Sequence, residues 1–243
     1  VTPAAISLLL VSCSEETSEG GPAPADSGTS KSATKTSSSK PVSPEAAYEA
    51  RDGEACERLA EQSYRGQGAP KDLKRAIKYG EKACELGRAR MCFGLGTLFG
   101  LGKEVPLDLK RAARFFKKAC DGKDGRGCLA LARLVLKDSP KQALALLKEA
   151  CGLKVGEACR HLGTAFLKGQ GMPKDHTKAA QVYKRGCELK DAESCYNLGV
   201  CYMQGFGVKK NPQTAVKLIR EACKAGFKHA DCDKVKGGQA SAG

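Results

Sequence analysis

The sequence predicts an all-α fold, a right-handed α-solenoid built from helix-turn-helix repeats. Aromatic residues make up 5% of the 243 residues and tryptophan is absent. Alanine and leucine supply most of the apolar content, which favours helices that pack closely over small side chains. Cysteines recur with a period near 36 residues, and small residues, glycines and capping residues recur in the same register. Agreement among these patterns favours stacked helical hairpins.

The start of the chain predicts export. Residues 1–12 are interpreted as a truncated signal peptide, because 4–12 form an apolar run too short to span a bilayer. The stretch Leu10-Val11-Ser12-Cys13 resembles a bacterial lipobox, in which Cys13 becomes the lipidated first residue. A basic segment before the run is missing, so a start site placed too late and an apolar segment without signal function stay open. The composition of residues 13–44 predicts a disordered tether, and residues 237–243 are expected to form a disordered tail.

A set of six cysteines defines the repeat register over residues 45–236. They follow one another at intervals of 36, 36, 31, 36 and 37 residues: Cys56, Cys92, Cys128, Cys159, Cys195 and Cys232. Three positions after each register cysteine lies an apolar residue, and glycine or alanine follows in five of the six units. This pattern predicts the first helix of each hairpin.

Glycine loops and polar caps predict where each first helix ends and each second helix begins. Gly169 and Gly171 form one such loop. Short polar side chains that can cap a helix stand sixteen residues after the register cysteine at Asp72, Asp108, Asp175 and Asn211. Within the second helix, alanines seven positions apart lie on one face and allow neighbouring helices to approach closely.

The cysteine spacing favours disulfides over a metal site. The chain has 13 cysteines and 3 histidines but no C-x-x-C motif, so we expect neither a metal nor another cofactor. Pairs of nearly identical spacing imply a repeated disulfide, which is typical of proteins outside the reducing cytosol. The pairs are Cys84/Cys92, Cys120/Cys128, Cys151/Cys159, Cys187/Cys195 and Cys223/Cys232.

The repeat resembles the Sel-one-like repeat family, relatives of tetratricopeptide repeats. The signature L-G-x2-[YF] stands at Leu95-Gly96-x2-Phe99, Leu162-Gly163-x2-Phe166 and Leu198-Gly199-x2-Tyr202, and the resemblance covers about 46–236. The cysteine pairs resemble those of Hcp-type cysteine-rich proteins secreted by bacteria. That resemblance implies that each pair bridges consecutive helices, so the solenoid is expected to carry inter-helix disulfides.

Two departures from the repeat are expected to matter locally. The third unit is five residues shorter and carries Lys137-Asp138-Ser139-Pro140 in place of the glycine loop. Tyr48 stands where the partner of Cys56 is expected, and Cys201 also lies outside the pattern. We expect Cys56 and Cys201 to be buried thiols.

The charge distribution favours an anionic partner. The net charge of +14 falls on the repeats, because residues 1–45 hold more acidic than basic residues. Basic residues such as Lys74, Lys110 and Lys117 crowd the second helices, where they form either an ordinary solvated face or a positive stripe for an acidic ligand. Nucleic acid is not an expected partner, because no stacking aromatics interleave the charges.

The sequence offers no convincing catalytic constellation. The matches to S-x-x-K, Ser32-x-x-Lys35 and Ser37-x-x-Lys40, lie in the predicted tether, where no pocket could activate a lysine. The three histidines fall in different repeats: His161, His176 and His229.

These observations predict a non-enzymatic protein–protein interaction module or adaptor of the bacterial cell envelope. We expect a lipoprotein anchored through Cys13 in the periplasm or at the outer membrane, or otherwise a secreted protein. A protein or peptide, acidic in character, is expected to bind first-helix residues, namely Arg90, Phe93, Arg126, Arg160, Tyr196 and Asn197. Weak β-lactamase or penicillin-binding activity, implied only by the resemblance to Hcp-like proteins, and a role as an assembly factor for envelope complexes stay open.

Overall fold

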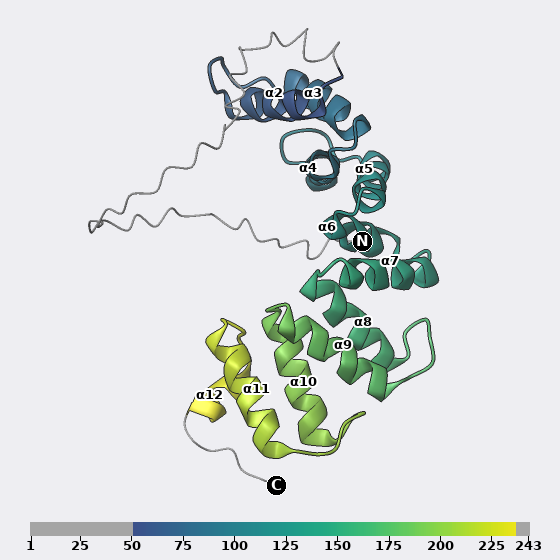
Figure 1. Cartoon of the computed structure of the whole chain (residues 1–243), viewed down its shortest axis with the longest axis vertical. Helices are drawn as coiled ribbons and strands as arrows, with labels where there is room; N and C mark the ends of the chain where they lie inside the picture. Colours follow the sequence, from purple (N-terminus) through teal and green to yellow (C-terminus); the bar gives the residue numbers. More distant parts are fainter. Residues whose placement is uncertain (1–50, 237–243) are drawn as a thin grey trace, which may run out of the picture. The chain divides into compact units, whose positions relative to one another are not determined.

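The computed structural model describes residues 51–236, which form eleven α-helices and no strand (Figure 1). The predicted signal peptide, the lipobox at Cys13, Tyr48 and residues 237–243 lie outside this range. The first helices of the five hairpins are α2 (Gly53–Arg65), α4 (Ala89–Leu101), α6 (Gly125–Val135), α8 (Gly156–Lys168) and α10 (Ala192–Gln204). The second helices are α3 (Leu73–Glu85), α5 (Leu109–Asp121), α7 (Pro140–Gly152), α9 (His176–Glu188) and α11 (Pro212–Lys224), and α12 (Ala230–Lys236) follows them.

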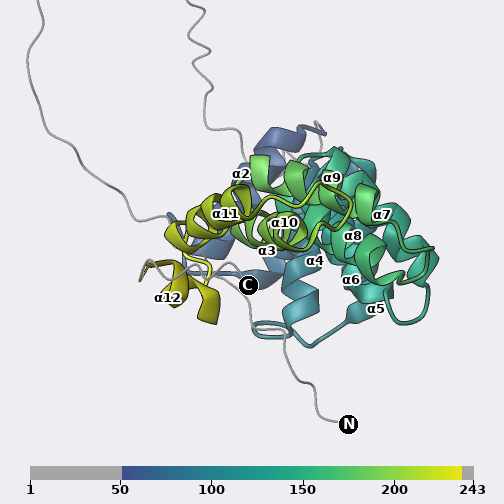
Figure 2. The ribbon, with the colours of Figure 1, turned by 90° about the horizontal axis from the view of Figure 1, so that it is seen from below.

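Each first helix packs on the second helix of its own hairpin, and α4, α6, α8 and α10 also pack on the second helix of the preceding hairpin. Figure 2 shows this for α8, α9 and α10, which lie side by side. Since each hairpin contacts mainly its neighbours, the predicted α-solenoid of helix-turn-helix repeats is confirmed.

Predicted polar caps begin four of the second helices. The side-chain oxygen of Asp72 accepts a hydrogen bond from the Arg75 backbone N–H at 3.0 Å, and Asp108, Asp175 and Asn211 make the same bond. The short third hairpin differs, because Ser139 makes no such side-chain bond and Pro140 occupies the first turn of α7. The proline fixes a helical φ and needs no hydrogen-bond partner there, which offsets part of the missing cap.

In the second, fourth and fifth hairpins, a glycine on the first helix faces a large side chain on the second helix. A Cβ atom added at Gly96 would lie 2.6 Å from the Phe116 ring, and one at Gly163 would lie 2.6 Å from the Tyr183 ring. The first hairpin lacks the large residue, since α2 carries the buried Ala60 and α3 carries Gly80, whose neighbours are Leu95 and Met91 of α4. The glycine of the L-G signature therefore makes room for a bulky residue four positions after the first core alanine of the second helix.

Disulfides join consecutive hairpins at every junction of the solenoid. Each links the last turn of a second helix to the start of the next first helix, as Cys84 does with Cys92, and the last one links α11 to α12. Cys56 and Cys201 are buried and belong to none of the five bridges. Disulfides in this number indicate an extracellular or periplasmic protein.

Candidate partner-binding surface

The six predicted partner-binding residues lie on four successive first helices. Arg90 and Arg126 stand two positions before their register cysteines and are exposed. The other four lie just after the register cysteine and are half-buried: Phe93, Arg160, Tyr196 and Asn197. We call the side chains from four positions before to five positions after each register cysteine the first-helix row.

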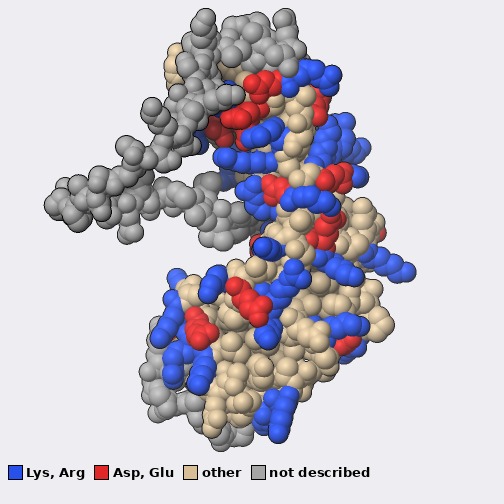
Figure 3. All heavy atoms as spheres, in the orientation of Figure 1, with Lys and Arg blue, Asp and Glu red and all other residues tan. Residues whose placement is uncertain are grey.

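Ion pairs connect the row between α2 and α4. Arg88 binds the Glu57 carboxylate at 2.5 Å, and Arg90 binds Glu61 at 3.1 Å. Figure 3 shows acidic and basic side chains side by side over these two helices. Glu57 is nearly buried, so its contact with Arg88 compensates a carboxylate that has lost most of its water.

An aromatic contact takes the place of the ion pair between α4 and α6. The Arg126 guanidinium lies 4.6 Å from the centroid of the Phe93 ring and also pairs with Asp124 at 2.6 Å. Asp124 caps α6, accepting a hydrogen bond from the Arg126 backbone N–H. The Asp124 carboxylate therefore binds both the backbone N–H and the guanidinium of Arg126, and it holds the guanidinium against the face of the Phe93 ring.

A charged network joins α6, α8 and α10. Glu157 on α8 pairs with Arg133 of α6 and, at 3.1 Å, with Arg160. Arg160 continues to Glu193 at 3.2 Å and to Asp191 at 3.5 Å on the α10 side. His161, whose Nε2 lies 3.8 Å from Glu157, and the two arginines lower the pKa of the Glu157 carboxyl to about 2.

Tyr196 makes the last junction, between α10 and α12. Its hydroxyl donates a hydrogen bond to Asp231 at 2.8 Å and lies 3.1 Å from His229 Nδ1, while its ring contacts Phe227. Burial, followed by the nearby Asp231 carboxylate, raises the pKa of the Tyr196 hydroxyl to about 12. The tyrosine is therefore a neutral donor at physiological pH.

Four of the five junctions, all except that between α6 and α8, share one geometric rule that sequence reasoning missed. The residue after the register cysteine of one hairpin contacts the first turn of the next first helix, as Glu57 contacts Arg88, Phe93 contacts Arg126 and Arg160 contacts Glu193. Because the chemistry differs at each junction, residue type alone did not show the relationship. Its signal was the fixed distance from the register cysteine.

Two of the predicted residues meet at a shallow cleft of about 450 Å³ between the starts of α4, α6 and α8. Arg90 and Arg126 border it together with Lys123, and Asp124 contributes the only acidic side chain. Leu153 and Val155 add apolar surface. The complete lining is Ala89, Arg90, Gly122, Lys123, Asp124, Gly125, Arg126, Leu153 and Val155. Phe93, Arg160, Tyr196 and Asn197 are not part of this cleft.

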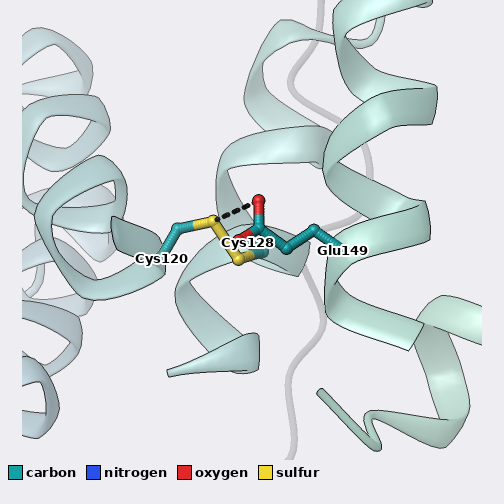
Figure 4. A group of neighbouring side chains, drawn as sticks. All are labelled: Cys120, Cys128 and Glu149. Atoms are coloured by element: carbon teal, nitrogen blue, oxygen red, sulfur yellow. Dashed lines mark hydrogen bonds between the residues drawn. A yellow bond between two sulfur atoms is a disulfide. The ribbon is translucent and has the colours of Figure 1, made fainter. Parts of the chain in front are cut away.

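One cluster of potential metal ligands lies beside the cleft (Figure 4). Cys120, Cys128 and Glu149 have ligand atoms within 4.8 Å of one another. The two sulfurs are bonded to each other, so neither is a thiolate that could bind a metal. Glu149 Oε2 approaches Cys120 Sγ to 3.7 Å, and its other oxygen pairs with Lys123 at 3.1 Å. The carboxylate thus acts as an ionic partner of a lysine that lines the cleft.

The three histidines do not converge on one site. His161, His176 and His229 belong to α8, α9 and the segment before α12, and the two S-x-x-K motifs lie outside residues 51–236. Within the same range, no helix has the combination of length and apolar character needed to cross a bilayer.

Family comparison decides what kind of repeat this is. The Sel1 repeat family model matches residues 53–87, 89–124, 156–191 and 192–227, more than half of the chain. The chain belongs to the Sel1 repeat family. The matches omit 125–155, which contain both helices of the short third hairpin, while the other four hairpins follow the family pattern. Sel1 repeat proteins are generally protein-interaction modules.

Two solved structures share this fold, and a third is similar in sequence. A Sel1 repeat protein from Oxalobacter formigenes superposes with a TM-score of 0.66 at 24% identity, over 76% of this chain and 74% of that chain. The protective antigen c5321 of uropathogenic Escherichia coli superposes with a TM-score of 0.67 at 23% identity, and the match covers 73% of this chain and 39% of c5321. Cysteine-rich protein B of Helicobacter pylori is 36% identical over 55% of this chain and 98% of its own, with a TM-score of 0.45. No curated protein sequence matches the chain significantly.

Proposed function

We propose that this Sel1 repeat protein is a non-enzymatic adaptor of the bacterial cell envelope that binds an acidic segment of a partner protein. The cleft between α4, α6 and α8 is the observation that carries the proposal. Three cations, Arg90, Lys123 and Arg126, surround apolar surface from Leu153 and Val155. This combination suits a peptide that offers a carboxylate beside an apolar side chain.

The cleft is built on rigid elements. The bridge between Cys120 and Cys128 fixes the start of α6 against α5, and the bridge between Cys151 and Cys159 fixes α8 against α7. Because the chain is already ordered there, a partner would lose little affinity to the ordering of its binding site. The five disulfides support an extracellular or periplasmic location, and lipidation at Cys13 is our proposal for how the protein is held at a membrane.

Site-specific photo-crosslinking tests the proposal. We expect a crosslinking residue at Lys123 to capture a discrete envelope protein, and the same residue at exposed Lys209 to capture none. With the identified partner purified, Arg90→Gln/Arg126→Gln should weaken binding about tenfold, which corresponds to about 1.4 kcal/mol. Lys168→Gln/Lys209→Gln removes the same charge from exposed positions outside the cleft and should leave the affinity unchanged.

Equal crosslinking at the two positions, or an affinity insensitive to Arg90→Gln/Arg126→Gln, would contradict the cleft as the binding site. Recovery of several envelope subunits as one stable complex would favour the assembly-factor alternative. Hydrolysis of nitrocefin by the oxidised protein, above a heat-inactivated control, would favour the β-lactamase alternative.

A further inference from the structure

The outward faces of the five second helices form a second surface, separate from the cleft. Each of these helices has 13 residues. Alanines at the fourth position, such as Ala112 and Ala143, are fully buried and fix which side faces the core. Positions two, six, nine and thirteen lie on the opposite side, and every residue at these positions is exposed except half-buried Glu81. We call this set of positions the outer ridge.

Cations outnumber acidic residues on the outer ridge, and the excess lies on α5, α7 and α11, because the two kinds balance on α3 and α9. Position nine carries Glu81 in the first hairpin and then Lys117, Lys148, Lys184 and Arg220 in the four that follow. Positions two and six add Lys74, Lys78, Lys110, Arg114, Lys141 and Lys217. In Figure 3, Lys and Arg side chains line the side of the molecule that α5 and α7 form. The acidic residues of the ridge are Glu81, Glu85, Asp121 and Glu188.

The chemistry of the ridge differs from that of a typical protein–protein interface. No position of the ridge carries an aromatic residue, leucine, isoleucine or methionine, whereas interface hot spots are enriched in Trp, Tyr and Arg that fill pockets. Most of the cations are lysines, which act as hydrated point charges and lack the planar fork that binds a single carboxylate or phosphate in two places. Such a surface suits a broad layer of negative charge.

We propose that the outer ridge binds the anionic headgroup surface of a lipid bilayer. Lysines attract anionic headgroups without inserting into the bilayer, and the attraction adds up over each lysine near the surface. The cations recur on all five second helices, so an extended surface can engage several of them at once. The residues that line the cleft are not themselves part of the ridge.

Vesicle flotation with the oxidised Cys13→Ser full-length chain tests this proposal without any contribution from lipidation. The probes are vesicles of pure phosphatidylcholine and vesicles that also contain about one third phosphatidylglycerol. We expect binding only to the anionic vesicles, with a loss of binding as salt is raised, because salt screens exposed charges. Absence of binding to the anionic vesicles at low salt would overturn the proposal.

A matched pair of variants separates the ridge from net charge. Lys110→Gln/Lys148→Gln/Lys184→Gln removes three ridge charges and should lower the vesicle partition coefficient about tenfold or more. Lys137→Gln/Lys168→Gln/Lys209→Gln removes three charges at exposed positions in or beside the hairpin loops and should change it less than about twofold. An equal effect of the two variants would overturn the proposal in favour of an unspecific charge effect.

Two further outcomes keep this inference distinct from the adaptor proposal. Arg90→Gln/Arg126→Gln should bind anionic vesicles as the parent does, because neither residue is on the ridge. A ridge that retained an acidic polypeptide such as polyglutamate but no anionic vesicle would identify an acidic protein surface as the ligand and overturn the membrane assignment.

Discussion

At the level of single residues, Glu157 joins basic side chains from two first helices. It lies between Arg133 of α6 and Arg160 and His161 of α8, which hold the pKa of its carboxyl at about 2. The carboxyl is ionised throughout the ordinary pH range, and the contacts favour the folded state because they lower this pKa below its usual value near 4.5.

The stability of the α6–α8 junction should therefore depend on acidity. A folded pKa below the unfolded one stabilises the protein above about pH 4.5, and this contribution is lost as the pH falls toward 2. Urea denaturation between pH 6 and pH 3 measures it. Glu157→Gln should lower stability at pH 6 and flatten the pH dependence, whereas Glu188→Gln on the exposed face of α9 should not. A Glu157→Gln profile parallel to that of the parent would contradict this reading.

Burial makes Cys201 a poor nucleophile. It is 1% exposed within α10, and burial raises the pKa of its thiol to about 11. Only about one molecule in a thousand then carries the thiolate at pH 8. We expect the native protein to incorporate iodoacetamide at Cys201 far more slowly than the urea-unfolded protein with its disulfides intact, as followed by mass spectrometry. Equal rates in the two states would show that the thiol is accessible.

At the level of the helix pair, the fit between small and large residues sets the spacing of each hairpin. Gly96 faces the Phe116 ring, whereas Gly94, two positions earlier on α4, has no neighbouring atom within 4 Å of an added Cβ. The two glycines lie on the same helix and differ in what surrounds them, so they form a matched pair.

Gly96→Ala should destabilise the protein and Gly94→Ala should stabilise it. A methyl group 2.6 Å from the Phe116 ring forces the helices apart, at a cost of about 1–3 kcal/mol. Alanine at Gly94 lowers the entropy of the unfolded chain and favours the helix by about 0.5–1 kcal/mol. Thermal unfolding of the oxidised proteins checks both signs. A neutral Gly96→Ala would contradict the role of this glycine in spacing the helices.

Much of this arrangement was predictable from the sequence, and the reasons are physical. The period of the cysteines, the alanines and the caps reports helix boundaries, because those residues act on their own helix or on its immediate neighbour. The contacts of the first-helix row, by contrast, depend on how far each helix is rotated about its own axis. The periodic pattern shows that Phe93 and Arg160 occupy equivalent positions. Only the structure shows that Phe93 faces Arg126 and that Arg160 faces Glu193.

The cleft was predictable only in part, for the same reason. Arg90 and Arg126 were expected to face a partner, and the structure brings both to one concavity. Leu153 and Val155 come from the turn between α7 and α8, which keeps the regular spacing of the cysteine pair. The turn after α3 meets the preceding first helix in the same way, since a Cβ atom added at Gly53 would contact Leu86 and Arg88. The repeat therefore predicts this contact, but it does not show that these residues border a concavity.

At the level of the whole molecule, stability depends on the junctions between hairpins. Contacts in this solenoid are mainly between neighbours, so its free energy of unfolding is close to a sum of hairpin and junction contributions. Each disulfide closes a short loop at one junction and contributes about 2–3 kcal/mol by a chain-entropy estimate.

Removal of a central disulfide should therefore destabilise a different part of the molecule from removal of the last disulfide. Cys151→Ala/Cys159→Ala should lower the free energy of unfolding by about 2–3 kcal/mol and raise hydrogen exchange on both sides of the α7–α8 junction. Cys223→Ala/Cys232→Ala should raise exchange mainly in α11 and α12. Full reduction should lower the melting temperature well below that of the oxidised protein, and identical melting curves would contradict a stabilising role for the bridges.

The contacting residues differ from one junction to the next, so each hairpin fits best beside its present neighbours. If recombination deleted the third hairpin, Phe93 would meet Val155 and Glu157 in place of Arg126, and its cation–π contact would be lost. Duplication of the first hairpin would set the acidic Glu57 against the acidic Asp52 and Glu54 of the copy. Deletion of the third hairpin or duplication of the first would thus remove or reverse the contacts at the new junction.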